Sequence, residues 1–238
     1  MAENSNHGTL RSRNSADTVA NRSETDAYLA SLREKRQPVP GTGRLIFALD
    51  ATASRRPTWE MACQLQAQMF EEVKTTGGLS VQLVYYRGLE ECRASKWISR
   101  PDHLSGLMEK IDCRMGHTQI GKILTHAQRE TRLLKVSALT FVGDACEEDP
   151  DKLAHEAGEL GRLGVPVFLF QEGHDREVER TFREIARLTH GAYSRFDPGA
   201  ARQLAELLKA VAVFATGGLT VLADQHNAGA VKLLSQLR

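Results

Sequence analysis

From about residue 44 onward, short apolar runs alternate with longer segments in which apolar residues recur at helical spacing. Continuous runs such as Leu45–Leu49 are typical of strands that are covered on both faces of a sheet. Strands are expected over residues 45–49, 79–86, 92–98, 136–142, 165–170 and 192–196. Helices are expected over residues 57–76, 101–111, 117–134, 151–163, 175–189 and 200–215.

This alternation predicts an α/β fold. Strands that alternate with helices form right-handed βαβ units, which build a parallel sheet. We therefore expect a doubly wound, mostly parallel central sheet with helices on both faces. The more polar segment 92–98 is expected to be one short antiparallel strand at the sheet edge.

The two ends of the chain differ from this pattern. Residues 1–43 are polar and poor in large apolar groups, so we expect a mostly disordered N-terminal arm with a short helix over residues 25–35. The α/β domain is expected over residues 44–216, ending where Gly217 and Gly218 interrupt the last helix. Residues 217–238 would form a short C-terminal helical appendage. Its apolar face, over residues 228–237, could fold back on the domain or bind another protein.

Charge and composition narrow the functional classes. The chain has 31 Lys and Arg against 30 Asp and Glu, a net charge of +1, so it lacks one large basic field for nucleic acid. No apolar run approaches the roughly 18 residues that a membrane helix needs, and no secretory signal is visible. We expect a cytoplasmic protein that binds neither membrane nor nucleic acid. Its four cysteines, Cys63, Cys92, Cys113 and Cys146, are expected to be free thiols.

Oxygen-bearing side chains follow the central strands. Asp50, Thr52 and Ser54 come after the first strand, Thr118 precedes a helix, and Asp144 follows the fourth strand. Ligand sites of doubly wound sheets lie at the carboxyl ends of strands, so these five residues are expected to converge. Two carboxylates and three hydroxyls suit Mg²⁺ or Mn²⁺. With only two charged ligands, the chain alone would hold the metal weakly and leave positions open.

The same residues have a purely structural interpretation. Ser and Thr after a strand are common helix caps, so Ser54 and Thr118 could each cap the helix that follows. Three acidic residues after the fourth strand could be an acidic first helical turn or a negative rim around the metal site. They are Glu147, Glu148 and Asp149.

The arrangement of these residues resembles the metal-ion-dependent adhesion site of von Willebrand factor type A (VWA) domains. That family carries a DxSxS motif after the first strand, a Thr in a turn and an Asp after the fourth strand. Asp50, Thr52 and Ser54 match the first motif with Thr at its second position. Thr118 matches the second and Asp144 the third. The similarity covers residues 44–216, and it is to uncharacterised bacterial members of the family.

The resemblance implies a non-catalytic, metal-dependent protein-binding module. By this resemblance, Mg²⁺ or Mn²⁺ would be held by Asp50, Thr52, Ser54, Thr118 and Asp144. An Asp or Glu of a partner protein would complete its coordination. Cytosolic members often serve multiprotein complexes, some of them with ATPases. A metal-free VWA domain with a structural role is a further possibility.

Two other chemistries use the same part of the chain. A phosphatase of the haloacid-dehalogenase type would use Asp50 as its nucleophile and Thr118 to bind phosphate. Its general acid is replaced by Thr52, and Pro57 opens a helix where such enzymes insert a flap. A zinc site of Cys113, His117 and Cys146 matches no standard ligand spacing.

Overall fold

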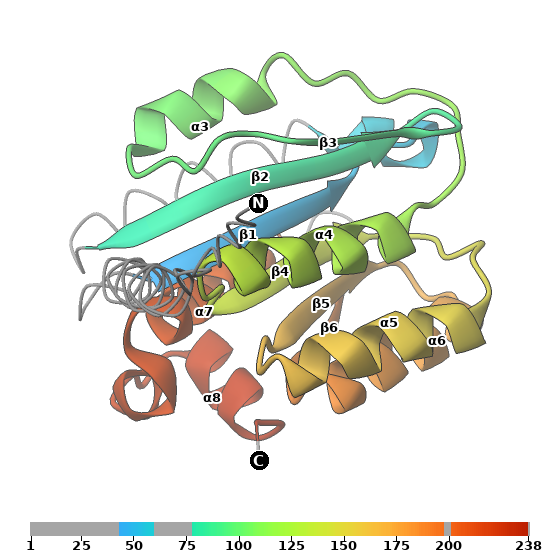
Figure 1. The fold of residues 1–238 in the computed structure, drawn as a ribbon. Helices are drawn as coiled ribbons and strands as arrows, with labels where there is room; N and C mark the ends of the chain where they lie inside the picture. The colour runs from blue at the N-terminus through green and yellow to red at the C-terminus, as the bar shows by residue number, and fades with distance from the viewer. Residues whose placement is uncertain (1–42, 60–77, 198–200, 238) are drawn as a thin grey trace, which may run out of the picture. The chain divides into compact units, whose positions relative to one another are not determined.

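The computed structural model describes residues 43–59, 78–197 and 201–237. This part of the chain builds a six-stranded sheet in the order β3-β2-β1-β4-β5-β6 (Figure 1). The strands are β1 (Gly43–Asp50), β2 (Leu79–Arg87), β3 (Glu91–Ala94), β4 (Ala138–Gly143), β5 (Val167–Glu172) and β6 (Ala192–Phe196). All neighbours pair in parallel except β2 and β3, which pair antiparallel at the sheet edge. The predicted fold class is confirmed.

Helices cover both faces of the sheet. They are α3 (Pro101–Met108), α4 (Ile120–Leu133), α5 (Pro150–Arg162), α6 (Arg176–Leu188), α7 (Ala201–Ala223) and α8 (Ala228–Leu234). Side chains of α4, α5 and α6 share one apolar core with one face of the sheet, and those of α7 and α8 share a second core with the other face. Strands buried from both sides explain why β1, β4 and β5 read as continuous apolar runs.

Strand β3 is shorter than the expected segment 92–98. The hydroxyl of Ser95 accepts the Leu83 backbone N–H at 3.0 Å, and the Gln82 side chain donates to the Ser95 carbonyl. The Ser95 N–H still donates to the Leu83 carbonyl at 2.8 Å, and an isolated bridge between Val81 and Ile98 follows, but the Ser95 side chain takes the place of one backbone acceptor and regular pairing ends.

Helix α7 consists of two helical segments joined by a kink at Gly218, where the sequence predicted that the helix is interrupted. Gly218 has φ 69° and ψ −163°, which breaks the helical geometry, and helical residues resume after it. Residues Arg202–Ala223 are long and apolar enough to cross a membrane, which corrects the sequence expectation that no segment reaches this length. Their buried residues, including Leu204, Leu208 and Val211, pack into the core on the sheet, as expected for a core helix.

The C-terminal segment folds back on the domain, which decides between the two alternatives that the sequence left open. Ala230 and Leu233 of α8 are fully buried in the core that α7 shares with the sheet. A Cβ atom on Gly229 would lie 2.2 Å from the Glu206 carbonyl oxygen, so glycine permits this close approach of α8 to α7.

Several expectations fall outside the described residues. They are the disordered arm with its helix over residues 25–35, Cys63 and most of the helix expected over residues 57–76. Of that helix the structure describes residues 57–59, which are helical. The other three cysteines, Cys92, Cys113 and Cys146, are free thiols as expected.

Candidate functional site

The carboxyl ends of β1 and β4 bring Asp50 and Asp144 to the same edge of the sheet. Leu49 pairs with Val142, which places Asp50 beside Gly143, the residue before Asp144. A Cβ atom on Gly143 would lie 3.4 Å from the Asp50 Cβ. Two acidic side chains 94 positions apart in the sequence therefore lie at neighbouring strand ends, as predicted.

Asp50 is fully buried and both of its carboxylate oxygens accept hydrogen bonds. The Thr52 backbone N–H donates to Oδ1 at 2.7 Å, and the Tyr86 hydroxyl donates to Oδ2 at 2.9 Å. Burial raises the pKa of Asp50, and the nearby Asp144 carboxylate raises it further, while the hydrogen bonds from Thr52 and Tyr86 oppose the rise. A cation at this edge would relieve both unfavourable effects.

The hydroxyls of Thr52 and Ser54 are hydrogen-bonded to each other at 3.0 Å. Adjacent oxygens around an octahedral Mg²⁺ with bonds of about 2.1 Å are also about 3.0 Å apart. Thr52 precedes a short 3-10 helix, η1 (Ala53–Arg55), and its side chain makes no capping hydrogen bond there. Ser54 lies inside η1, so neither hydroxyl plays the helix-capping role that the structural interpretation required.

Thr118 is held by the loop that follows β4. Its Oγ1 accepts the Glu147 backbone N–H at 2.9 Å, and the Glu147 carboxylate accepts the Thr118 backbone N–H at 3.1 Å. Helix α4 begins at Ile120, and its N-cap Gln119 makes no side-chain cap bond. Thr118 is therefore not a helix cap, and its reciprocal bonds fix it to the loop that carries Asp144.

The three acidic residues after β4 have separate roles that the sequence did not predict. The Glu148 carboxylate accepts the backbone N–H groups of Ile120 and Gly121, so it caps α4 from another loop. Only Asp149 belongs to the following helix: it is the N-cap of α5 and accepts the Asp151 N–H at 2.9 Å. Glu147 and Glu148 thus clamp the Thr118 loop in place.

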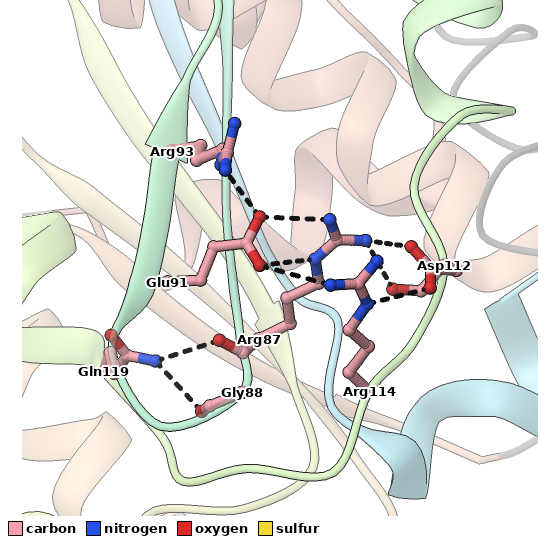
Figure 2. Close-up of polar contacts among 7 residues, drawn as sticks. All are labelled: Arg87, Gly88, Glu91, Arg93, Asp112, Arg114 and Gln119. Carbon is pink, nitrogen blue, oxygen red and sulfur yellow. Dashed lines mark hydrogen bonds and ion pairs between the residues drawn. The ribbon is translucent and has the colours of Figure 1, made fainter.

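A network of charged side chains holds the segment that leads into the Thr118 loop (Figure 2). Arg87, at the end of β2, donates two hydrogen bonds of 3.0 Å to Glu91 and also pairs with Asp112. Arg114 pairs with Asp112 at 2.9 Å, and its backbone N–H donates to the Ala51 carbonyl at 3.0 Å. The hydrogen bond from Arg87 lowers the pKa of Glu91, so this carboxylate stays charged in neutral solution. The network ties the loop from residue 112 onward to β2 and β1.

Asp144 has the feature most suggestive of a missing ligand. Its Oδ1 atom is buried and has no hydrogen-bond partner among the described residues. An unpaired buried carboxylate oxygen is costly, and natural proteins rarely keep one without a bound water or ion. The donor set of Asp50, Thr52, Ser54, Thr118 and Asp144 therefore fits a hard divalent cation.

Sequence reasoning missed Arg55 and Glu172, which lie beside this site. The Arg55 side chain is 1% exposed and forms an ion pair with Glu172 at the end of β5. Burial lowers the pKa of Arg55, whereas the nearby carboxylates of Asp144 and Asp50 raise it. An arginine next to a DxSxS-like motif has no distinctive sequence signal, because most arginines point into solvent.

A metal site of another kind is absent from the described parts of the chain. Within residues 43–59, 78–197 and 201–237, no three His, Cys, Asp or Glu side chains gather to hold a metal ion. The zinc alternative of Cys113, His117 and Cys146 is therefore not supported. Burial also raises the pKa of the Cys113 and Cys146 thiols to about 11, and metal-binding cysteines act as thiolates.

Comparison with known proteins establishes the fold. The sequence matches no family model and no curated protein. A von Willebrand factor type A structure from Catenulispora acidiphila is similar over 73% of this chain, with a TM-score of 0.59 and 18% identity. This similarity spans 43% of the length of that structure. The chain thus has the fold of VWA domains.

Two further solved structures are similar in fold to this chain. The SpRpn10 VWA domain is similar over 74% of this chain and 98% of its own length, with a TM-score of 0.57 and 13% identity. An aerotolerance-related membrane protein from Bacteroides fragilis is similar over 67% of this chain and 95% of its own, with a TM-score of 0.54 and 20% identity. At these identities the similarity describes the fold, and the chain's own residues must support any function.

Proposed function

We propose that this protein is a non-catalytic, divalent-metal-dependent protein-binding module. In this proposal Asp50, Thr52, Ser54, Thr118 and Asp144 hold Mg²⁺ or Mn²⁺, and an Asp or Glu of a partner protein completes the coordination. The observation that carries the proposal is the buried, unpartnered Oδ1 of Asp144 at the strand end next to Asp50. The 3.0 Å separation of the Thr52 and Ser54 hydroxyls supports it.

The charges near the site suit a divalent cation. Asp50, Asp144 and Glu172 are acidic and Arg55 is basic, so these four side chains carry a formal charge of −2 when ionised. A bound Mg²⁺ would act as a Lewis acid that attracts a carboxylate. The chain's own part is to hold its oxygens in place: Tyr86 and Thr52 orient Asp50, and Glu147 orients Thr118.

The rim of the site offers contacts for a protein partner. Met115 is 85% exposed and Leu89 is 72% exposed, and they lie on two loops that touch each other. The His117 N–H donates to the Gly88 carbonyl at 3.2 Å, which joins these loops. Arg114 on the same rim is half exposed. Apolar and cationic side chains around a metal favour a partner segment with an acidic residue beside an apolar one.

The geometry does not favour the phosphatase alternative. A nucleophilic carboxylate must reach the phosphorus atom of its substrate, yet Asp50 has no exposed surface and both of its oxygens accept hydrogen bonds. Helical residues 56–59 follow η1 directly, where such enzymes would carry a flap. The non-catalytic function therefore remains the better supported one.

The first experiment is thermal unfolding with EDTA, Mg²⁺ or Mn²⁺. A site filled at a hundred times its Kd stabilises the fold by about 2.7 kcal/mol, which raises Tm by about 5–10 °C in a chain of this size. We expect this shift in the wild type, its loss in Asp144→Ala, and its retention in Asp224→Ala. Asp224 is an exposed acidic control in the loop between α7 and α8.

Partner capture tests the second half of the proposal. A partner retained by the wild-type protein in Mg²⁺ should be released by EDTA and should not bind to Asp144→Ala. Mutation of one acidic residue of that partner should have the same effect. Capture that is indifferent to chelator and to Asp144 would instead support a metal-free structural role.

A further inference from the structure

The Arg55 side chain reaches from the segment after β1 to the end of β5. Arg55 belongs to η1, which follows β1, and its guanidinium pairs with Glu172, the last residue of β5. In the sheet, β4 lies between β1 and β5, so the end of β4 lies between these two points. Asp144 follows directly after that end.

Strand register supports this placement. Gly143 of β4 pairs with Gln171 of β5, so the residues that follow them, Asp144 and Glu172, lie at the same level of the sheet edge. Asp50 lies beside Gly143 on the other side of β4. The carboxyl ends of three adjacent strands therefore each carry one carboxylate, and the buried Arg55 guanidinium pairs with one of them, Glu172. Burial lowers the pKa of Arg55, and the charges of the other two carboxylates, Asp144 and Asp50, also act on it and raise this pKa.

Arg55 is anchored but not fully paired. Thr58 Oγ1 donates to the Glu172 carboxylate at 3.0 Å and also lies 3.2 Å from the Arg55 carbonyl, which links the two partners. The Nε atom of Arg55 is buried and has no hydrogen-bond acceptor within the described ranges, and Asp144 Oδ1 lacks a donor there. One buried donor on Arg55 and one buried acceptor on Asp144 are thus both left unsatisfied.

We propose that Arg55 is a built-in counter-cation of the metal site: it balances Asp50 and Asp144 in the metal-free protein and competes with a divalent cation for them. The ion pair with Glu172 holds the guanidinium toward β5 and so prevents it from forming an ion pair with Asp144. This inference rests on the proposed function where metal is concerned, but its electrostatic half concerns the metal-free protein alone. Arginine suits the role because it stays charged when buried.

The metal-free half is tested by a double-mutant cycle in EDTA. The variants are Arg55→Gln, Asp144→Asn and their combination, compared by urea unfolding. If Arg55 balances Asp144, its loss should be less harmful once Asp144 is neutral, with a coupling of about tenfold or more in the unfolding equilibrium constant. Additive effects, to within about twofold, would overturn the proposal whatever the protein's affinity for metal.

A second set of variants, all carrying Glu172→Gln, controls for the case in which Arg55→Gln does not fold. Arg55→Gln leaves the Glu172 carboxylate buried and unpaired, which is strongly destabilising. The cycle is therefore repeated with Glu172→Gln added to each of its four proteins. In this set, replacing Arg55 removes the second charge of the ion pair and leaves no unpaired carboxylate at residue 172. Arg56→Gln is the matched control, because Arg56 is exposed and its side chain donates to the Cys113 carbonyl at 3.2 Å.

Metal titration tests the competition. We expect Arg55→Gln/Glu172→Gln to bind Mn²⁺ about tenfold or more tightly than Glu172→Gln, because the double variant lacks the competing cation. A general loss of structure would weaken binding, so tighter binding is a specific result. Equal or weaker binding would overturn the competition. Coupling in EDTA without Mn²⁺ binding by any variant would refute the proposed function and leave Arg55 as the permanent cation of the site.

Discussion

The hydroxyl of Tyr86 on β2 donates a 2.9 Å hydrogen bond to Asp50 at the end of β1. These residues are register partners in the parallel pair β1–β2, and both are fully buried. Burial raises the pKa of Tyr86 well above its ordinary value, and the Asp50 charge raises it further, so the hydroxyl keeps its proton. Tyr86 therefore orients Asp50 as a permanent donor while leaving the net charge of the site unchanged.

The Asp50 charge should make the stability of the metal-free protein fall as pH rises. Burial raises the folded-state pKa of Asp50 above its unfolded value, so its ionised form costs stability as pH rises through that interval. Asp50→Asn removes the charge, but its amide has one acceptor oxygen for two donors, the Thr52 N–H and the Tyr86 hydroxyl. In EDTA we therefore expect the stability of Asp50→Asn relative to wild type to increase from about pH 4 to about pH 7, and Mg²⁺ should no longer stabilise the variant. Asp224→Asn, at an exposed position, should change neither result, and a relative stability that is the same at both pH values would show that the Asp50 charge carries no cost.

Two glycine substitutions should have opposite effects. A Cβ atom on Gly116 would lie 2.0 Å from the Gly88 carbonyl oxygen, where the Thr118 loop meets the turn after β2. Gly116→Ala should therefore displace this loop, lower stability by about 1–3 kcal/mol and weaken metal binding. Gly158→Ala, in the interior of α5 with no atom within 4 Å of the new Cβ, should raise stability by about 0.5–1 kcal/mol. Urea unfolding measures the stability of both variants, and metal titration measures their affinity. Normal metal affinity in Gly116→Ala would show that the contact between Gly116 and Gly88 does not position the metal ligands.

The Arg87–Glu91 pair should make loop stability depend on pH. Its hydrogen bond lowers the folded-state pKa of Glu91, so its contribution is complete above the unfolded value and is lost as pH falls through the folded one. We expect Glu91→Gln to cost about 0.5–1 kcal/mol at about pH 7, and the difference from wild type to disappear near pH 3. Glu90→Gln is the neighbouring control. An unchanged difference at both pH values would mean that Glu91 acts through packing.

The C-terminal helix should be part of the folding unit. Leu233 of α8 is fully buried, whereas Val231 is 60% exposed on the same helix. Leu233→Ala should lower the free energy of unfolding by about 2–4 kcal/mol, and Val231→Ala by less than about 0.5 kcal/mol. Denaturant unfolding of both variants measures this contrast. Similar small effects would indicate that α8 detaches from α7 without unfolding the domain.

The predicted fold was confirmed because burial leaves a direct trace in the sequence. Strands covered on both faces, such as β1 and β5, are apolar along most of their length, and the helices between them carry one apolar face. The end of β3 was less accurate because the Ser95 hydroxyl, and not its carbonyl, accepts the Leu83 N–H, although the Ser95 N–H still pairs with the Leu83 carbonyl. The glycine pair correctly predicted the break at Gly218, whereas the helical segment that follows it to Ala223 was not predicted.

By itself, the sequence determined the order of the strands and helices and the positions of Asp50, Thr52, Ser54, Thr118 and Asp144 relative to the strand ends. Local spacing and polarity are sufficient for this, because a strand end is marked by the change from apolar to polar residues. Only the tertiary structure decided which charges meet there. Arg55, Glu172 and Tyr86 come from separate strand ends, and their contacts depend on strand order and register, which long-range packing sets and local patterns do not record.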